Sequence, residues 1–341
     1  MQSNPLVTVI TPTYNHERYI VDCIKSVQAQ TFSNWEMIII NDGSTDKTAE
    51  IVENYIKNDN RIILINQENV GIFRLAESYN KALGLSKGKY ISILEGDDLW
   101  EPFKLERQIS VLENNNKIIL AWGKAYSITD DLSKIIGLYP DLSSGKTVYF
   151  NNNPVGSILN LLLIENCIPA LTVTVRKDAL NKIEGFIQNH NLPLVDIPTL
   201  IELAKFGEFY FDEKPLGKWR IYANQITKTF PVEIIQGRLA LCLHHFSDIP
   251  DDIKCNISIS KNNIKKHFNN RIQIAYARSG RYKLIRKEFT AARKDYIKAI
   301  FYKGFRNLAW RLRAIIGYIF SLFRMDVEGI SKILGKDSYR K

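Results

Sequence analysis

The strongest constraint on the fold is a regular alternation of short apolar runs and amphipathic segments over the first hundred residues. The apolar runs, rich in β-branched residues, cover 6–11, 35–40, 61–66 and 90–94. Segments with apolar residues at helical spacing separate them, at 18–30, around 51–56 and at 74–86. Strands that alternate with helices form βαβ units with parallel strands and helices on both faces of the sheet. The sequence therefore predicts an α/β fold with a mostly parallel, Rossmann-like sheet.

The later part of the chain is predicted from the same patterns. We expect helices at 102–114, 155–164, 177–182 and from about Asp196 to 206, and strands at 118–126, 170–175 and 209–211. Residues 130–153 are turn-rich and receive no assignment, whereas everything from 232 onward has a helical pattern. A length of 341 residues suggests about two domains, or one α/β domain with an appendage. We predict a domain over 1–230 and a basic helical region over 231–341.

The composition indicates a protein of a reducing compartment. The four cysteines form no close pair and show no metal-ligand spacing, so we expect free thiols and a cytosolic location. The first residues lack the positive segment of a secretory signal. No uncharged apolar stretch approaches the roughly 20 residues that a membrane span requires.

Charge is distributed unevenly along the chain. The net charge is +10, and residues 261–341 contribute 21 basic and five acidic side chains, a net +16 that leaves −6 for the first 260 residues. Such a basic region indicates a polyanionic partner, either nucleic acid or anionic lipid. Segment 301–325 interleaves arginines with aromatic and aliphatic residues, which predicts a helix lying in a lipid headgroup layer. The alternative is a packed C-terminal helix with an ordinary apolar face.

An acidic turn follows the fourth predicted strand and reads Glu95-Gly96-Asp97-Asp98. In open α/β sheets, ligands bind at the carboxyl ends of the strands, where this turn is expected to lie. Three neighbouring carboxylates repel one another, and a divalent cation such as Mg²⁺ or Mn²⁺ relieves that repulsion. Gly96 permits the tight turn that aims the carboxylates inward. The alternative is a solvated acidic turn in which Asp98 caps the following helix.

Three motifs, in this order, resemble the inverting family 2 glycosyltransferases. They are Val-Ile-Thr-Pro-Thr-Tyr-Asn at 9–15, Ile-Ile-Asn-Asp-Gly-Ser-Thr-Asp at 39–46, and Gly-Lys-Tyr-Ile followed by Glu-Gly-Asp-Asp-Leu-Trp within 88–100. The resemblance covers roughly 5–229 and implies a GT-A-type, nucleotide-sugar-binding fold with a short second sheet on the acceptor side. It also implies transfer from a nucleoside-diphosphate sugar, UDP-sugar in particular, to a glycan or lipid-linked hydroxyl in bacterial surface polysaccharide synthesis. The cofactor implied is Mn²⁺ or Mg²⁺.

The resemblance also assigns roles to individual positions. The metal ligands it implies are Asp98 and then Asp97, and Asp97 also contacts the ribose. Glu95 stands where the family usually has Asp and reaches the metal through water or not at all. Tyr14 offers an aromatic face to the base, unless it is merely a rim aromatic. The complete set implied to bind the nucleotide sugar is Thr11, Pro12, Tyr14, Asp42, Arg74 and Asp97.

The resemblance places the catalytic base on Asp196, within Leu194-Val195-Asp196. In an inverting transfer this carboxylate removes the proton of the acceptor hydroxyl as it attacks the anomeric carbon. The alternative is that Asp196 caps the helix that follows it, and both roles are compatible.

Two positions depart from the pattern of the family. Arg220-Ile221-Tyr222 has Tyr222 where relatives often carry His, and a tyrosine hydroxyl is a poor metal ligand at neutral pH. Tyr79 precedes Asn80 where relatives often have Arg, which leaves Arg74 as the nearest cation. Arg74 therefore contacts the donor or is a solvated helix residue.

Histidines offer no rival metal site. His244 and His245 are adjacent, and on a helix their rings diverge by about 100°. His16, beside Asn15, is close to the expected donor pocket, and we expect it at the surface.

Three rival functions follow from other features of the chain. A dinucleotide-dependent enzyme is disfavoured because no Gly-x-Gly-x-x-Gly follows the first strand. A nucleic-acid-binding protein is compatible with the basic region, although the interleaved aliphatic residues suit lipid better. The third rival function is that of a catalytically inactive protein that only binds sugar nucleotide. We expect a peripheral enzyme on the cytosolic face of the inner membrane.

Overall fold

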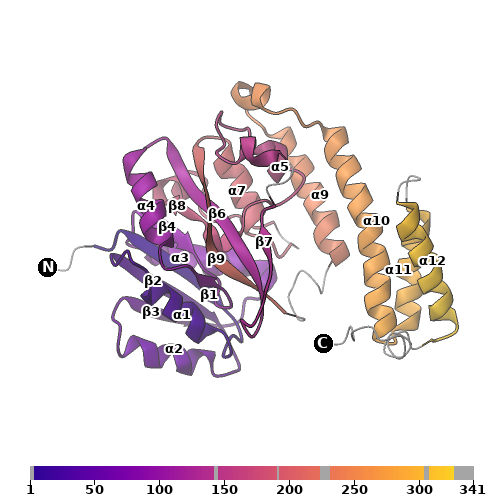
Figure 1. Ribbon diagram of the computed structural model, residues 1–341, viewed down its shortest axis with the longest axis horizontal. Coiled ribbons are helices and arrows are strands. Elements are labelled where there is room, and N and C mark those ends of the chain that lie inside the picture. Colours follow the sequence, from indigo (N-terminus) through magenta and orange to yellow (C-terminus); the bar gives the residue numbers. More distant parts are fainter. Residues whose placement is uncertain (1–3, 142–144, 190–191, 223–230, 303–306, 326–341) are drawn as a thin grey trace. The chain divides into compact units, whose positions relative to one another are not determined.

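The computed structural model describes residues 4–141, 145–189, 192–222, 231–302 and 307–325 (Figure 1). The chain forms two compact units. One comprises residues 1–222 together with 247–258, and the other comprises 223–246 together with 259–341.

The first unit contains the sheet and its flanking helices. Its elements are β1 (Val7–Thr13), α1 (Ile20–Gln28), β2 (Trp35–Asp42), α2 (Thr48–Ile56), β3 (Ile62–Gln67), η1 (Ile72–Arg74), α3 (Leu75–Leu85), β4 (Tyr90–Ile93), β5 (Leu99–Trp100), α4 (Lys104–Asn114), β6 (Ile118–Thr129), β7 (Ile135–Tyr139), η2 (Lys146–Tyr149), α5 (Leu159–Leu162), η3 (Ala170–Thr172), β8 (Thr174–Arg176), α6 (Lys177–Lys182), α7 (Asp196–Ala204), β9 (Glu208–Ile221) and η4 (Asp251–Asn256).

The described strands form one sheet in the order β3-β2-β1-β4-β8-β6-β9-β5, with β7 paired to β6. The four strands β3, β2, β1 and β4 are parallel to one another, as the alternating pattern predicts. Beyond β4 the sheet is mixed, because β8 runs antiparallel to both β4 and β6 while β6 and β9 are parallel. The α/β fold is therefore confirmed, with the parallel arrangement concentrated in its first half.

Helices cover both faces of the parallel half. Buried residues of α1 and α4 form one core cluster with alternate residues of β1 and β2, such as Val9 and Met37. Helix α3 packs against β1 and β2 through Tyr79, Ala82 and Leu83, outside that cluster. Successive strand residues point to opposite faces. Strands β1, β2 and β4 are buried along their whole length, as expected where helices cover both faces of the sheet.

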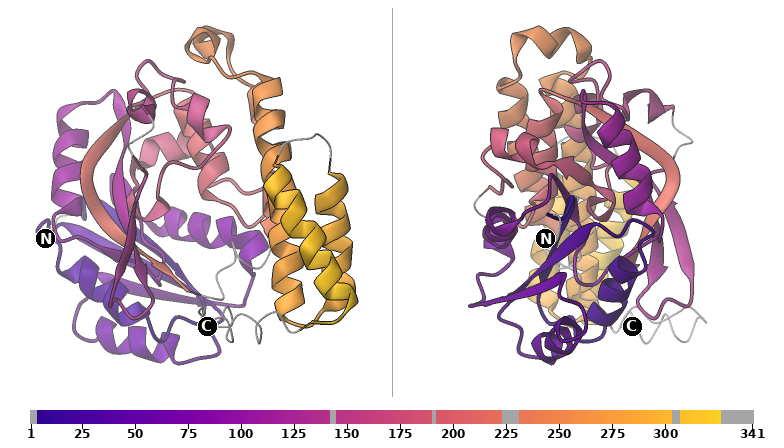
Figure 2. Two further views of the ribbon diagram at one scale, coloured as in Figure 1. Left: turned by 45° about the vertical axis from the view of Figure 1, so that its right-hand side comes forward. Right: turned by 90° about the vertical axis from the view of Figure 1, so that its left-hand side faces the viewer.

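Several expected elements differ in extent. Only α5 forms within 155–164, because Gly156 adopts a left-handed φ of +90°. At 170–175 a 3-10 turn precedes β8, since the Thr172 hydroxyl bonds to the carbonyls of Pro169 and Gly123. The expected strand at 209–211 extends through β9, whose pairing with β6 has register shifts. Such bulges bend a strand, and β9 curves visibly along its length (Figure 2).

The second unit contains helices in its described part. They are α9 (Pro231–Ser247), α10 (Lys261–Ile285), α11 (Phe289–Phe301) and α12 (Leu308–Leu322). Helices α10, α11 and α12 share a small core that includes Ala277, Ala292 and Ala314. The Tyr296 ring lies where a Cβ on Gly280 or Gly317 would clash, at 2.8 Å and 2.3 Å. These two glycines therefore let the helices close around one aromatic ring.

The predicted helical segment 301–325 is divided in the structure. Phe301 ends α11, residues 303–306 lie outside the described part, and α12 begins at Leu308. One side of α12 is packed inside the unit through Ala314, Gly317 and Ser321. No helix among the described residues is sufficiently long and apolar to span a bilayer.

The other side of α12 exposes large apolar side chains, which we call the α12 apolar face. Its members are Leu308, Leu312, Ile315, Ile316, Ile319, Leu322 and Phe323.

Candidate functional site

The loops after β1 and β2 are joined by hydrogen bonds at the carboxyl edge of the parallel strands. Asn15 adopts a left-handed conformation with a φ of 54°, and its Oδ1 accepts from the backbone N of Thr45 at 2.8 Å. The carboxylate of Asp46 accepts from the backbone N of Glu17 and of Thr48, each at 3.0 Å. Asp46 therefore has a structural role at the start of α2.

The residues expected to frame a nucleobase lie at the end of β1. Thr11 and Pro12 are buried within the strand, which continues to Thr13 instead of ending at Pro12. The Thr11 hydroxyl is buried and has no hydrogen-bond partner among the described residues. Tyr14, just beyond the strand, is 45% exposed, so its ring is accessible at the sheet edge.

Asp42 ends β2 and is almost fully buried. Its carboxylate accepts from Gln67 Nε2 at 2.8 Å and from the backbone N of Val70 and Gly71 at 2.9 and 3.0 Å. Gly71 has a φ of 76°, which favours glycine there. Asp42 thus holds the turn after β3 in place, a role that the sequence did not suggest.

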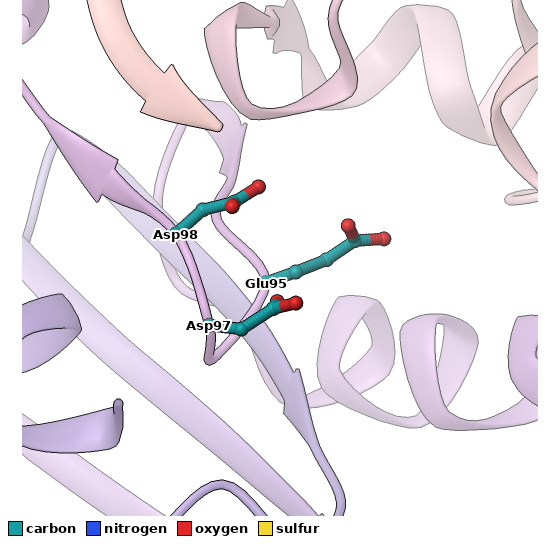
Figure 3. Close-up of side chains that lie close together, drawn as sticks. All are labelled: Glu95, Asp97 and Asp98. Atoms are coloured by element: carbon teal, nitrogen blue, oxygen red, sulfur yellow. The ribbon is translucent and has the colours of Figure 1, made fainter. Parts of the chain in front are cut away.

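Three acidic side chains gather on the loop between β4 and β5. Glu95, Asp97 and Asp98 each place a carboxylate oxygen within 4.8 Å of the others, and Figure 3 shows all three extending to the same side of the loop. Gly96 has no positive φ, but a Cβ there would lie 2.6 Å from the Thr13 hydroxyl. The expected tight turn is present, closed by a hydrogen bond from the backbone N of Asp98 to the carbonyl of Glu95 at 3.0 Å, and Gly96 is required in it for close approach to β1.

The alternative role of Asp98 as a helix cap is also wrong. Asp98 precedes the short strand β5, and the residue that caps α4 is Phe103. Asp98 is 2% exposed, so the loop is not a solvated acidic turn.

Each of the three carboxylates accepts a hydrogen bond, one from α3 and two from the end of β9. The pairs are Tyr79 Oη to Glu95 Oε1 at 3.0 Å, Tyr222 Oη to Asp97 Oδ2 at 2.9 Å, and the backbone N of Arg220 to Asp98 Oδ1 at 3.0 Å. Burial raises the pKa of Tyr79 and of Tyr222, with the neighbouring carboxylates adding to the effect. Both phenols therefore act as neutral donors to the cluster. Tyr222 also stacks on Tyr19, with ring centroids 5.5 Å apart.

The electrostatics of this cluster favour a bound cation. Burial raises the pKa of Glu95 to about 7, and the charge of Asp97 adds to that effect. Burial likewise raises the pKa of Asp98 well above its ordinary value, again with Asp97 as the next cause. Carboxylates whose charged forms are disfavoured either hold protons or neutralise a cation.

Arg220 is a cation that contacts the loop, and its side chain is 1% exposed. Its Nε donates to the backbone carbonyl of Asp97 and its Nη2 to the Asp22 carboxylate, both at 2.6 Å. Its Nη1 donates to the carbonyl of Asp130, and the guanidinium lies 5.0 Å from the Tyr19 ring centroid. The described hydrogen bonds of the guanidinium thus hold the backbone of the loop at Asp97.

Asp196 is the first residue of α7. The cap position is occupied by Val195, which makes no side-chain capping bond, so the capping alternative for Asp196 is wrong. Asn166 Nδ2 donates to Asp196 Oδ2 at 2.6 Å. The charge of Asp196 contributes to the raised pKa of Glu95, which places Asp196 within electrostatic range of the acidic loop.

Arg74 ends η1 and pairs with a neighbouring carboxylate. Its Nε and Nη2 donate to the two oxygens of Glu77 at 2.6 and 2.7 Å, and both side chains are exposed. A nucleotide contact by Arg74 would compete with this pair. His16, expected at the surface, is partly buried, and its Nδ1 lies 3.1 Å from the Thr13 hydroxyl.

The acidic cluster has donors that suit a hard divalent cation. Its carboxylate oxygens are the ligand type preferred by Mg²⁺ and Mn²⁺. Burial and the charge of Asp97 raise the pKa of Glu95 and of Asp98, and a bound cation would offset that unfavourable negative charge. Asp98 and Asp97 would hold the cation, and Glu95 is close enough to contribute to the same ligand group.

Comparisons with known sequences agree on one family. The model of glycosyl transferase family 2 matches residues 8–159. An uncharacterized glycosyltransferase of Haemophilus influenzae is 32% identical over 234 residues, which cover 67% of this chain and 70% of that protein. A putative teichuronic acid biosynthesis glycosyltransferase, TuaG of Bacillus subtilis, is 45% identical over 228 residues, covering 65% and 82%.

Solved structures with the same fold are similar over nearly the whole chain. The TarS fragment of S. aureus in complex with UDP-GlcNAc aligns with a TM-score of 0.54 at 15% identity, covering 97% of this chain and 92% of that one. The mannosyltransferase PcManGT of Pyrobaculum calidifontis, in complex with GDP-Man and Mn²⁺, aligns with a TM-score of 0.55 at 14% identity, covering 98% and 89%. At these identities the likeness concerns the fold.

Proposed function

Because the chain belongs to family 2 of the glycosyltransferases, we propose that it is a metal-dependent inverting enzyme. It transfers a sugar from a nucleoside-diphosphate sugar, a UDP-sugar in particular, to a hydroxyl of a glycan or lipid-linked acceptor. The observation that carries the proposal is the convergence of Glu95, Asp97 and Asp98 within electrostatic range of Asp196. The similarity to TuaG supports a role in bacterial surface polysaccharide synthesis.

The donor side of the site is formed by the ends of β1 and β2. Tyr14 stacks on the nucleobase, and its exposed ring at the strand end supports that role. The unpartnered hydroxyl of Thr11, next to Pro12, supplies a hydrogen bond beneath the base. Asp42 contacts the base or ribose while it holds the following turn, and Arg74 leaves Glu77 to reach the phosphates.

Asp98 and Asp97 hold the divalent cation, and Asp97 also contacts the ribose. A bound Mn²⁺ or Mg²⁺ neutralises charge that develops on the departing diphosphate. Tyr222 remains protonated because burial raises its pKa, so it orients Asp97 through a hydrogen bond and is not a metal ligand.

Asp196 accepts the proton of the acceptor hydroxyl as that oxygen attacks the anomeric carbon from the side opposite the leaving group. Attack from that side inverts the configuration at the anomeric carbon. The hydrogen bond from Asn166 fixes Oδ2 of the base and so fixes the orientation of the carboxylate.

Two substitutions separate the roles of base and metal site. A panel of nucleotide sugars with Mn²⁺, screened by donor hydrolysis and thermal shift, first identifies the donor. Asp196→Asn is then expected to lower transfer by about 100-fold or more while donor affinity is retained. Asp98→Asn should instead weaken the metal-dependent part of donor affinity, and the exposed Asp178→Asn serves as the matched control. If the Asp196→Asn variant still turns over, Asp196 is not the catalytic base. If the parent protein binds donor but shows no turnover, the alternative of a protein that only binds sugar nucleotide is supported.

We also propose that the protein is peripheral on the cytosolic face of the inner membrane, bound through the α12 apolar face. The face combines residues such as Ile316, which is 51% exposed, with the exposed cation Arg313. That combination suits an anionic lipid surface. Co-sedimentation with phosphatidylglycerol vesicles tests it, with Ile316→Ser/Ile319→Ser expected to reduce binding. A salt-sensitive gel shift without vesicle binding would favour the nucleic-acid alternative.

A further inference from the structure

An exposed apolar surface lies on the hairpin formed by the end of β6 and β7. We call it the hairpin surface, and its members are Leu132, Ile135, Ile136 and Leu138, between 43% and 55% exposed. Ile135 and Ile136 lie at a bulge in the pairing of β7 with β6, and both side chains are exposed there. Within the described residues, β7 pairs only with β6 and is an edge strand. Edge strands are usually protected by charge, so an apolar one indicates a contact partner.

The turn end of this hairpin is connected to the acidic loop. Arg220 donates one hydrogen bond to the carbonyl of Asp130, in the hairpin turn, and another to the carbonyl of Asp97. In the sheet register, Arg220 of β9 lies beside Ile128 of β6, and Ile128 lies beside Ile135 of β7. Two strand spacings separate these backbones, which places Ile135 about 10 Å from the Arg220 backbone.

The other end of β7 is connected to the proposed base. The hydroxyl of Tyr139 donates to the carbonyl of Asn166. The side chain of the same Asn166 donates to Asp196 at 2.6 Å. The hairpin surface therefore runs between the residue that holds the acidic loop and the residue that holds the base. A molecule whose hydroxyl meets Asp196 can extend along this strand.

We propose that the hairpin surface binds the hydrocarbon part of an amphiphilic acceptor, a sugar carried on a lipid. This inference rests on the proposed function and names the class of acceptor. Two features favour this occupant. The charges of the hairpin turn, Asp130 paired with Arg18 and Asp131 near the exposed Lys134, give no excess of positive charge that would attract an anionic bilayer. A five-residue strand also offers much less than the roughly 800 Å² per partner that a stable dimer buries.

The test compares acceptors that differ only in their hydrocarbon. Full-length enzyme receives the donor identified by hydrolysis, together with methyl and octyl glycosides of the same sugars below their micelle concentrations. The octyl acceptors should give kcat/KM values at least about tenfold higher, because several methylenes become buried. Ile135→Ser/Ile136→Ser should reduce the octyl-to-methyl ratio to near one while donor hydrolysis is unchanged. Thermal unfolding checks that the variant is folded.

Two control variants locate the effect. Leu85→Ser removes a similarly exposed apolar residue at the end of α3, near the amino end of β4. Ile316→Ser/Ile319→Ser alters the α12 apolar face. Both should retain the preference for the octyl acceptor.

Three results would overturn the inference. The first is an octyl-to-methyl ratio near one in the parent enzyme. The second is a ratio that falls only in the α12 variant. The third is a dimer in sedimentation velocity that Ile135→Ser/Ile136→Ser converts to monomer, since a second copy would then cover the hairpin surface. A parent enzyme that hydrolyses no donor would instead refute the proposed function itself.

Discussion

Replacing Glu95 by Gln should stabilise the metal-free protein at alkaline pH and leave it unchanged at acid pH. Glu95 is one of three carboxylates that lie within 4.8 Å of one another. Burial, and then the charge of Asp97, raises the pKa of Glu95 from 4.5 to about 7. Glutamine keeps an oxygen that accepts the hydrogen bond from Tyr79 but carries no charge.

The sign and size of the effect follow from proton linkage. The pKa of Glu95 is higher in the folded than in the unfolded chain, so its contribution to stability is complete below about pH 4.5. That contribution is lost as the pH rises through about 7. The difference between 4.5 and about 7 corresponds to about 3 kcal/mol, an upper value because Glu95 is not completely shielded from solvent. Above about pH 8, the free energy of unfolding of Glu95→Gln should therefore exceed that of the wild type by up to this amount.

Urea denaturation in a chelating buffer, at about pH 5 and about pH 8, measures this difference. Tryptophan fluorescence suits the experiment because Trp35, Trp100, Trp122 and Trp219 belong to the unit that contains Glu95. Glu53→Gln, an exposed position on α2, is the matched control and should show no pH-dependent gain.

Saturating Mn²⁺ should stabilise the wild type and reduce the advantage of the Glu95→Gln variant. Equal urea midpoints for wild type and variant at about pH 8 would refute the argument that this carboxylate is destabilised by burial and by its neighbours.

Three further outcomes are expected. Arg220→Lys should weaken metal-dependent donor affinity more than tenfold, measured by calorimetry, because lysine lacks the donors that hold the backbone of Asp97. Burial lowers the pKa of Lys104, so the free energy of unfolding of the wild type should rise as the pH approaches 10. Lys104→Met should remove this pH dependence, measured by urea denaturation at several pH values. Gly88→Ala should cost about 3 kcal/mol or more by urea denaturation, since its Cβ would lie 2.4 Å from the backbone of β1, whereas Gly84→Ala has open space and should be neutral or stabilising.

The sequence indicated the parallel half of the sheet well because helices separate its successive strands. That arrangement depends on local periodicity, which is visible in single segments such as 35–40. It failed for β9, for which the sequence predicted a strand only at 209–211 although the strand continues past Glu213, Lys214 and Gly217. Pairing with β6 through register shifts keeps these residues in one strand. Tertiary hydrogen bonds overrode local preference there.

In the candidate site, too, the sequence indicated some features and only the tertiary structure decided others. The position of the acidic loop at the carboxyl edge could be read from the order of strands and turns, and so could the position of Asp196 at the start of a helix. The family pattern drew attention to Tyr79 and Arg220, but nothing in the sequence indicated which groups Tyr79, Asn166 and Arg220 hydrogen-bond. Each belongs to a segment distant in sequence, and its hydrogen bond exists only after the chain has folded.

By itself, therefore, the sequence determined the alternating framework, the family motifs and which carboxylates stand at the strand ends. Only the tertiary structure decided which donors hold those carboxylates, that Gly96 serves close approach, and that an apolar hairpin joins the acidic loop to the base. The physical reason is the separation along the sequence of the residues that each effect involves. Periodicity and strand-end position are properties of neighbouring residues, whereas charge perturbation and side-chain hydrogen bonds arise between segments that only the packed fold brings together.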